Sequence, residues 1–243
     1  MRTTSKSSLR GKVALVTGAS RGIGRAIALS LASEGCDLII TGRNVSSLKT
    51  LQKALSQKKI RVLGMKCDVS DPVSVGELFA AVKKRFRRLD ILINNAGVGH
   101  IGSPVAELPV EAWEEVIETN LTGTFLVTRA ALPLMKRHAA VVNNLSVAAK
   151  RVFAGSSAYN ASKHGALAFT NSLREELRER GIRVIALLPG ATDTAIWDAL
   201  WPEAPRKKMM SAATVAKALV SAISVPNDGT VEELTIRPSA GTL

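Results

Sequence analysis

Short apolar runs alternate with longer amphipathic segments along almost the whole sequence. Runs this apolar are typical of strands that are buried on both faces of a sheet, and the segments between them are long enough for crossover helices. The alternation predicts one α/β domain, in which a doubly wound parallel sheet of about seven strands lies between two layers of helices. The predicted strands are Val13–Val16, Leu38–Ile40, Arg61–Met65, Ile91–Ile93, Val141–Val142, Val184–Leu188 and Leu234–Ile236.

Boundary signals place several of the helices. The pair Asp71-Pro72 predicts the start of one helix, and Gly181 predicts the end of a helix over Ala158–Arg180. A third helix is expected over Trp113–Met135.

The ends of the chain and its composition limit the remaining possibilities. With 46% hydrophobic residues in 243, the chain can fill a sizeable core, which excludes disorder for its bulk. Residues 1–11 are basic and rich in Ser and Thr, so we expect a flexible N-terminal arm ahead of a single domain over 12–243. No apolar run approaches a membrane span, and two cysteines fit neither a disulfide framework nor a metal site. We therefore expect a cytoplasmic protein without a metal ion.

The charge is strongly basic, with 33 Lys and Arg against 20 Asp and Glu, or +13. Part of it, at 83–88, lies at the end of a predicted helix, where cations complement the helix dipole. Another part, Arg206–Lys208, lies in a Pro-flanked loop without interleaved aromatic residues. Neither cluster has a nucleic-acid-binding pattern, so we expect no nucleic-acid partner and leave open an anionic small ligand or carrier.

A glycine-rich turn joins the first predicted strand to a helical pattern over Arg25–Glu34. Glycines without Cβ atoms let the backbone approach a pyrophosphate, and the helix N-terminus offers free N–H groups. In this position the turn predicts a dinucleotide-binding site of the Rossmann type. The residues of the turn that would bind the cofactor are Gly18, Ser20, Arg21, Gly22, Ile23 and Gly24.

The second predicted strand ends without an acidic residue. An acid there would bind the ribose 2'-hydroxyl of NAD, whereas the sequence has Thr41-Gly42-Arg43-Asn44. The Arg43 guanidinium suits a 2'-phosphate, with Arg21 as a second partner, and this favours NADP(H). The alternative is that Arg43 is a solvated loop cation.

Tyr159 is the only tyrosine in the chain, and Lys163 follows it by four residues. This spacing stacks the two side chains on one helix face, where a nearby ammonium would lower the pKa of the phenol and make it a general acid or base. Ser146 follows the fifth predicted strand, so its hydroxyl could hold a substrate carbonyl beside the phenol. Taken alone, a Tyr–Lys pair of this spacing is more often a surface pair.

Six motifs occur in order and at mutually consistent spacing. They are Thr17–Gly24, Asp68-Val69, Asn94–Gly97, Asn120, Ser146 with Tyr159–Lys163, and Pro189-Gly190 with Thr194. Together they resemble the motifs of the short-chain dehydrogenase/reductase family along nearly the whole chain. One departure is Leu145, which stands where the family usually has a second serine.

The resemblance implies a catalytic tetrad. In it Tyr159 exchanges a proton with the substrate oxygen, Ser146 positions that oxygen, Lys163 lowers the tyrosine pKa and holds the nicotinamide ribose, and Asn120 supports a water relay. The resemblance also implies further cofactor contacts and a homo-tetramer or homo-dimer. Those contacts are Asp68 and Val69 at the adenine, Asn95, Ala96 and Gly97 at the ribose, and Pro189, Gly190, Thr192 and Thr194 at the nicotinamide carboxamide and phosphates.

Some of these residues have plainer interpretations. Asn120 could be a polar residue inside a helix, Thr194 an N-cap of the next segment, and Asn94–Gly97 a turn that ends a strand. Substrate specificity is expected from the loops 98–108, 147–157 and 192–210. These loops carry His100 and several aromatic and Met side chains, which would form either a lid over an apolar carbonyl compound or a packed surface. The aromatic and Met side chains are Phe153, Trp197, Trp201, Met209 and Met210.

Three classes of function remain open. The first is an NADP(H)-dependent oxidoreductase that interconverts a carbonyl compound and its alcohol by hydride transfer. The second is a 3-oxoacyl carrier-protein reductase, whose basic surface would meet an acidic carrier. The third is a non-catalytic dinucleotide-binding sensor or scaffold, which would not need a tyrosine of lowered pKa.

Overall fold

The computed structural model describes residues 9–99 and 102–241. Seven strands in this part of the chain form one parallel sheet in the order β3-β2-β1-β4-β5-β6-β9, which confirms the predicted sheet. The order reverses between β1 and β4, and ligands of such sheets bind at this point, outside the carboxyl ends of the strands. The strands are β1 (Val13–Val16), β2 (Asp37–Gly42), β3 (Val62–Lys66), β4 (Ile91–Asn94), β5 (Ala140–Asn144), β6 (Arg183–Pro189) and β9 (Glu233–Ile236).

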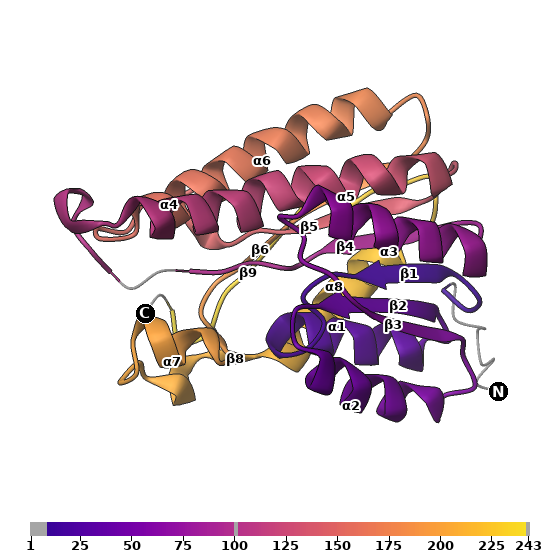
Figure 1. Cartoon of the computed structure of the whole chain (residues 1–243), viewed down its shortest axis with the longest axis horizontal. Coiled ribbons are helices and arrows are strands. Elements are labelled where there is room, and N and C mark those ends of the chain that lie inside the picture. Colours follow the sequence, from indigo (N-terminus) through magenta and orange to yellow (C-terminus); the bar gives the residue numbers. More distant parts are fainter. Residues whose placement is uncertain (1–8, 100–101, 242–243) are drawn as a thin grey trace.

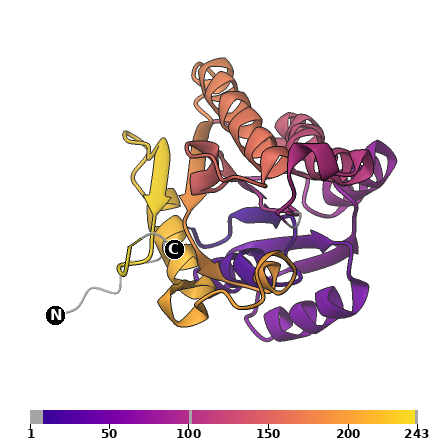
Figure 2. The ribbon, with the colours of Figure 1, turned by 90° about the vertical axis from the view of Figure 1, so that its left-hand side faces the viewer.

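Helices cover both faces of the sheet (Figure 1). One core cluster joins the sheet to α1 (Gly22–Ser33), α2 (Val45–Ser56) and α8 (Ala212–Ile223). The other joins it to three helices of the opposite layer, and Figure 2 shows the two layers from the end of the sheet. Those helices are α3 (Pro72–Arg85), α5 (Gly123–Ala131) and α6 (Ser157–Leu177), and α4 (Val110–Ile117) precedes α5.

Local sequence explains the elements. In β1, Ala14 and Val16 enter one core cluster and Val13 and Leu15 the other, so a run without polar residues is needed. The predicted start of α3 is confirmed, because the Asp71 carboxylate caps the helix by accepting from the backbone N–H groups of its first turn.

The structure differs from the prediction at two elements. The expected helix over Trp113–Met135 is divided into α4 and α5 by the π-helical turn Glu118–Thr122. A small second sheet pairs β7 (Thr192–Asp193) with β8 (Met210–Ser211), and α7 (Ile196–Leu200) lies between them. Strands of two residues carry no apolar run, which is why the sequence did not reveal them.

The expected flexible arm is wrong at its inner end. Leu9 is only 2% exposed, and the Gly11 N–H donates to the Gly35 carbonyl at 2.9 Å. Residues 9–11 are therefore part of the folded body, because the first strand needs this cover at its amino end. Residues 1–8 of the expected arm lie outside the described residues. Within the described residues, no helix has the length and apolar character needed to cross a membrane.

Candidate active site

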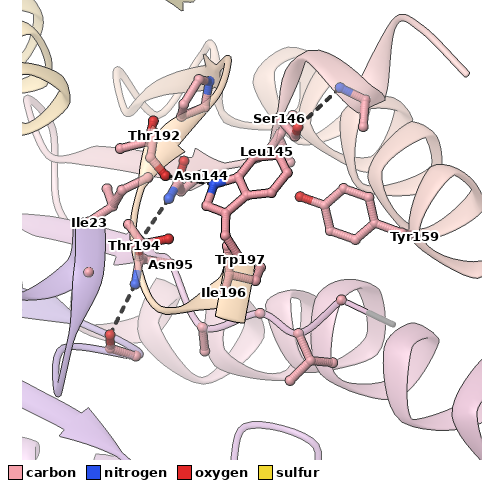
Figure 3. A pocket seen from close by; sticks show the side chains of 18 of the residues that line it. Ile23, Asn95, Asn144, Leu145, Ser146, Tyr159, Thr192, Thr194, Ile196 and Trp197 are labelled. Atoms are coloured by element: carbon pink, nitrogen blue, oxygen red, sulfur yellow. Dashed lines mark hydrogen bonds between the residues drawn. The ribbon is translucent and has the colours of Figure 1, made fainter. Parts of the chain in front are cut away.

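A cavity of about 760 Å³ lies at the carboxyl edge of the sheet. It brings together most of the site residues that the sequence predicts, but Gly24 and Asn120 are not part of its lining. Figure 3 shows part of this lining. The predicted residues that line the cavity are Gly18, Ser20, Arg21, Gly22, Ile23, Arg43, Asp68, Val69, Asn95, Ala96, Gly97, Ser146, Tyr159, Lys163, Pro189, Gly190, Thr192 and Thr194.

The glycine turn is locked against the loop after β4. Gly18 has φ +61°, and a Cβ atom there would lie 2.8 Å from the Ala96 Cα. Behind the turn, a Cβ atom at Gly24 would overlap the Asn95 amide, which donates to the carbonyls of Thr17 and Gly18 at 2.9 and 3.2 Å. The close approach of two backbones is therefore enough to require these glycines.

Asn95 is more than part of a strand-ending turn. Its side-chain oxygen accepts a hydrogen bond of 2.8 Å from the Asn144 amide at the end of β5. The side chain thus joins the loops that follow β1 and β4 to the end of β5, and so fixes the floor of the cavity at the switch point.

Arg43 lines the cavity immediately after the carboxyl end of β2. Its guanidinium lies 3.4 Å from the Glu115 carboxylate of α4, and both side chains are more than half exposed. Asn44 caps α2 by accepting from the Ser47 N–H, and both of these residues also line the cavity. A cation and a helix N-terminus therefore face the same space, which favours a negatively charged group there.

Asp68 and Val69 follow β3 on the neighbouring wall. Burial opposes ionisation of Asp68, but hydrogen bonds from Ser70 and the nearby charges of Arg43 and Lys66 lower its pKa below the usual value. Val69 is buried, and its side chain packs where a Cβ atom at Gly123 would lie.

The hydroxyls of Ser146 and Tyr159 face one another in the cavity (Figure 3). Burial raises the pKa of Tyr159, although its hydrogen bond with Ser146 acts in the opposite direction. Ser146 is oriented from its other side, because its oxygen accepts from the Ala148 N–H at 3.1 Å.

The expected effect of Lys163 on the tyrosine pKa is not found. The Lys163 Nζ lies 5.5 Å from the centroid of the Tyr159 ring and donates to the Asn144 carbonyl at 3.3 Å. Burial lowers the pKa of Lys163 itself to about 8, which weakens the ammonium that would stabilise a phenolate. Desolvation therefore has the largest effect on the pKa of both groups.

Asn120 lies in the π-helical turn and is only 2% exposed. Its amide donates to the Val98 carbonyl at 2.9 Å and to the Ser162 Oγ at 3.0 Å, and its oxygen accepts from the Val98 N–H at 2.8 Å. Both side-chain N–H groups are thus occupied. The side chain joins the loop after β4 to α6, which carries Tyr159 and Lys163.

The sequence model described as short chain dehydrogenase matches residues 12–205. The chain belongs to the short-chain dehydrogenase/reductase family. An uncharacterized oxidoreductase of Staphylococcus saprophyticus is 37% identical to it over 234 residues, 95% of this chain and 98% of that protein. An alcohol dehydrogenase from the archaeon Thermococcus sibiricus, complexed with 5-hydroxy-NADP, has a TM-score of 0.90 and 32% identity, with 96% of this chain and 99% of that chain covered. A short-chain dehydrogenase/reductase from Burkholderia phymatum, in complex with NAD, has a TM-score of 0.84 and 29% identity, with 93% and 89% covered.

In this short-chain dehydrogenase/reductase the segment 192–210 is built by specific contacts. The interpretation of Thr194 as an N-cap is wrong, because α7 is preceded by Ala195 and has no side-chain cap. A Cβ atom at Gly22 would instead lie 3.3 Å from the Thr194 Cγ2, which places Thr194 against the glycine turn. The segment was expected to be either a lid or a packed surface, and its residues differ in this respect. Trp197 and Trp201 line the cavity, whereas Met210 is buried in the core beside α8. His100 lies outside the described residues.

The sequence did not single out Asn144 and Ser162. Asn144 orients Asn95 with its amide and accepts from Lys163 with its carbonyl, and Ser162 accepts from Asn120. Their closeness in sequence to predicted site residues could have pointed to them, because Asn144 lies two residues before Ser146 and Ser162 directly precedes Lys163.

Proposed function

We propose that this oxidoreductase uses NADP(H) to interconvert a ketone, aldehyde or 3-oxo compound and its alcohol by hydride transfer. The observation that carries the proposal is the facing pair of Ser146 and Tyr159 hydroxyls, in one cavity with the glycine turn and Arg43. A dinucleotide fits these residues, because backbone without Cβ atoms lies where phosphates would approach and a cation lies where a 2'-phosphate would end.

The bound cofactor would supply or accept the hydride. Gly18, Gly22 and the N-terminus of α1 would hold its pyrophosphate, Arg43 its 2'-phosphate, and Lys163 its nicotinamide ribose. Pro189, Gly190, Thr192 and Thr194 would hold the nicotinamide end, where Gly190 is fixed by a 2.7 Å hydrogen bond to the Ile236 carbonyl.

Tyr159 would transfer the proton. A raised pKa keeps its phenol protonated near neutral pH, and this is the state that donates a proton to a carbonyl oxygen as hydride arrives. Ser146 would hold the same oxygen, and Asn120 would maintain the spacing between the cofactor loop and α6.

The test is an assay of ketones, aldehydes and 3-oxoacyl thioesters with NADPH and with NADH, in which oxidation of the cofactor is measured by absorbance. Reduction of several carbonyl compounds with a preference for NADPH is the expected result. Binding of NADPH without turnover on any of them would favour the non-catalytic sensor or scaffold.

A 3-oxoacyl carrier-protein reductase is the second candidate, and one observation favours it. Arg151 and Arg237 line the cavity and have no ion-pair partner among the described residues, whereas Asp68 is the only carboxylate on the described lining. Cations left unpaired at the substrate end suit a substrate with a phosphate or an acidic carrier. A carrier-bound 3-oxoacyl thioester should then react with a lower KM than the same acyl group on N-acetylcysteamine.

We also propose a cytoplasmic homo-oligomer. Cys36 and Cys67 are free thiols, as a reducing compartment requires. Trp113 on α4 and Phe125 on α5 are exposed, and Phe125 packs edge-on against Phe169 of α6, so these helices present apolar side chains to solvent. Light scattering at a monomer mass of about 26 kDa across micromolar concentrations would exclude the oligomer.

A further inference from the structure

Trp197 projects from α7 into the middle of the cavity. In Figure 3 its indole points toward the hydroxyls of Ser146 and Tyr159, with Thr192 and Asn144 on its other side. The indole Nε1 donates to the Thr192 carbonyl at 2.9 Å, and the Trp201 ring contacts it edge-on at 6.4 Å between centroids. A rigid aromatic side chain thus occupies the space next to the group that would protonate a substrate.

The helix that carries Trp197 has little stability of its own. The helix α7 has five residues, which is too short to be stable alone. The base of the segment is fixed by the pairing of β7 with β8, in which Thr192 is opposite Met210 and Asp193 is opposite Ser211. The part that carries Trp197 therefore depends on side-chain contacts.

Arg206 supplies these contacts. Its Nη1 donates to the Asp193 carboxylate at 2.8 Å and to the Thr194 carbonyl at 2.9 Å, and its Nη2 donates to the Asp198 carboxylate. These three partners flank Trp197 on both sides in the sequence. The guanidinium is largely covered, with the side chain 27% exposed, so these contacts are less weakened by solvent than ordinary surface pairs.

We infer that Trp197 determines which substrates fit by limiting the size of the group beside the reacting carbon, and that Arg206 is a positioning residue that holds it there. The inference rests on the proposed carbonyl reduction. It names the substrate class as aldehydes and slender ketones, in which one substituent on the carbonyl carbon is small. Bulky diaryl ketones are excluded by the indole.

The size role is tested with acetophenone as the slender substrate and benzophenone as the bulky one. Trp197→Ala should raise the ratio of kcat/KM for benzophenone to that for acetophenone by about tenfold or more, because the shape of an apolar pocket discriminates by such factors. Val73→Ala is the control, since Val73 lies on α3, is 69% exposed and does not line the cavity, so its loss should leave the ratio unchanged. If Trp197→Ala does not fold, Trp197→Phe replaces it and should raise the ratio by a smaller factor. An unchanged ratio in an active Trp197 variant overturns this role.

The positioning role is tested by Arg206→Met, which keeps the apolar stem and removes the guanidinium. We expect a higher KM for acetophenone with a smaller change in kcat, a relaxed size ratio, and partial rescue by Arg206→Lys. Lys207→Met is the matched control, because Lys207 is an exposed neighbouring cation without a side-chain partner among the described residues. A KM and a size ratio equal to those of Lys207→Met overturn the role of Arg206.

A readout that does not need activity separates this inference from the proposed function. Acrylamide should quench tryptophan fluorescence more strongly in Arg206→Met than in Lys207→Met, and the difference should vanish when Trp197→Phe is added to both. If the wild type reduces no carbonyl compound but this difference appears, the proposed function fails and the positioning by Arg206 stands. Equal quenching in the two variants overturns the positioning by Arg206 whether or not the enzyme is active.

Discussion

Arg43 offers the sharpest test of the cofactor preference. A contact with a 2'-phosphate would stabilise the bound cofactor, and the ion pair of Arg43 with Glu115 would be lost when that contact forms. A charge-assisted contact between its guanidinium and a 2'-phosphate contributes about 1.5 to 3 kcal/mol. In the free protein Arg43 pairs with Glu115 at 3.4 Å, with side chains 56% and 57% exposed, and such an exposed pair contributes at most about 1 kcal/mol. With a pair contribution of about 1 kcal/mol the difference is about 0.5 to 2 kcal/mol, so Arg43→Ala should raise the Kd for NADPH by about twofold to thirtyfold.

By the same reasoning, Glu115→Gln should change the Kd for NADPH in the opposite direction. Loss of the competing carboxylate frees Arg43, and the Kd for NADPH should fall by up to about fivefold. The control is Glu114→Gln, which removes the same charge from the same helix but from a side chain without an ion pair to Arg43.

The assay is calorimetric titration with NADPH and with NADH at one fixed salt concentration, since exposed charges are screened. The Kd for NADH should stay within about twofold in all three variants, because NADH has no 2'-phosphate. Equal weakening of both cofactors by Arg43→Ala would refute the assignment of Arg43. A Glu114→Gln effect as large as that of Glu115→Gln would refute the competition by Glu115.

Three further predictions concern the same cavity. Tyr159→Phe removes the ionisable oxygen and keeps the ring, so turnover should fall by about two to four orders of magnitude while calorimetry finds NADPH binding nearly unchanged; more than about a tenth of the wild-type rate would contradict general acid catalysis. Because burial lowers the pKa of Lys163 to about 8, the cofactor-free protein loses this proton as the pH rises through that value, so the Kd for NADPH should increase above it in the wild type and follow a flatter profile in Lys163→Met. Gly18→Ala places a Cβ atom 2.8 Å from the Ala96 Cα at a positive φ, and should lower the Tm and weaken both cofactors, whereas Gly76→Ala, which meets open space, should not lower the Tm.

Most of the fold follows from the sequence because the sheet is covered on both faces. The five inner strands, β2, β1, β4, β5 and β6, are almost entirely buried and must be apolar runs, and such runs are visible without a structure. The π-helical turn at Asn120 is different, because its residues have no distinctive periodicity and its conformation depends on the bonds of the Asn120 amide to Val98 and Ser162. Contacts of this kind join segments far apart in the chain, so spacing alone does not show them.

The site divides in the same way. Motif spacing predicts that the Ser146 and Tyr159 hydroxyls come together, but it does not show the burial of Tyr159 in the cavity wall, which raises the pKa of its phenol. Arg206 is a further example. In the sequence it belongs to a cluster of three cations, and only the folded segment shows that it binds carboxylates 13 and 8 residues earlier.

Tyr159 is the only tyrosine among the 243 residues. Phenolate absorbs ultraviolet light differently from phenol, so a spectrophotometric pH titration of the unlabelled wild-type protein reports on one known atom, without the overlapping signals that several tyrosines produce. The titration begins from a phenol whose pKa is raised, and any lowering caused by a bound nucleotide or a candidate substrate appears directly as a displaced curve. The chain therefore contains its own optical probe of the proton donor, and compounds can be screened against it before any turnover has been observed.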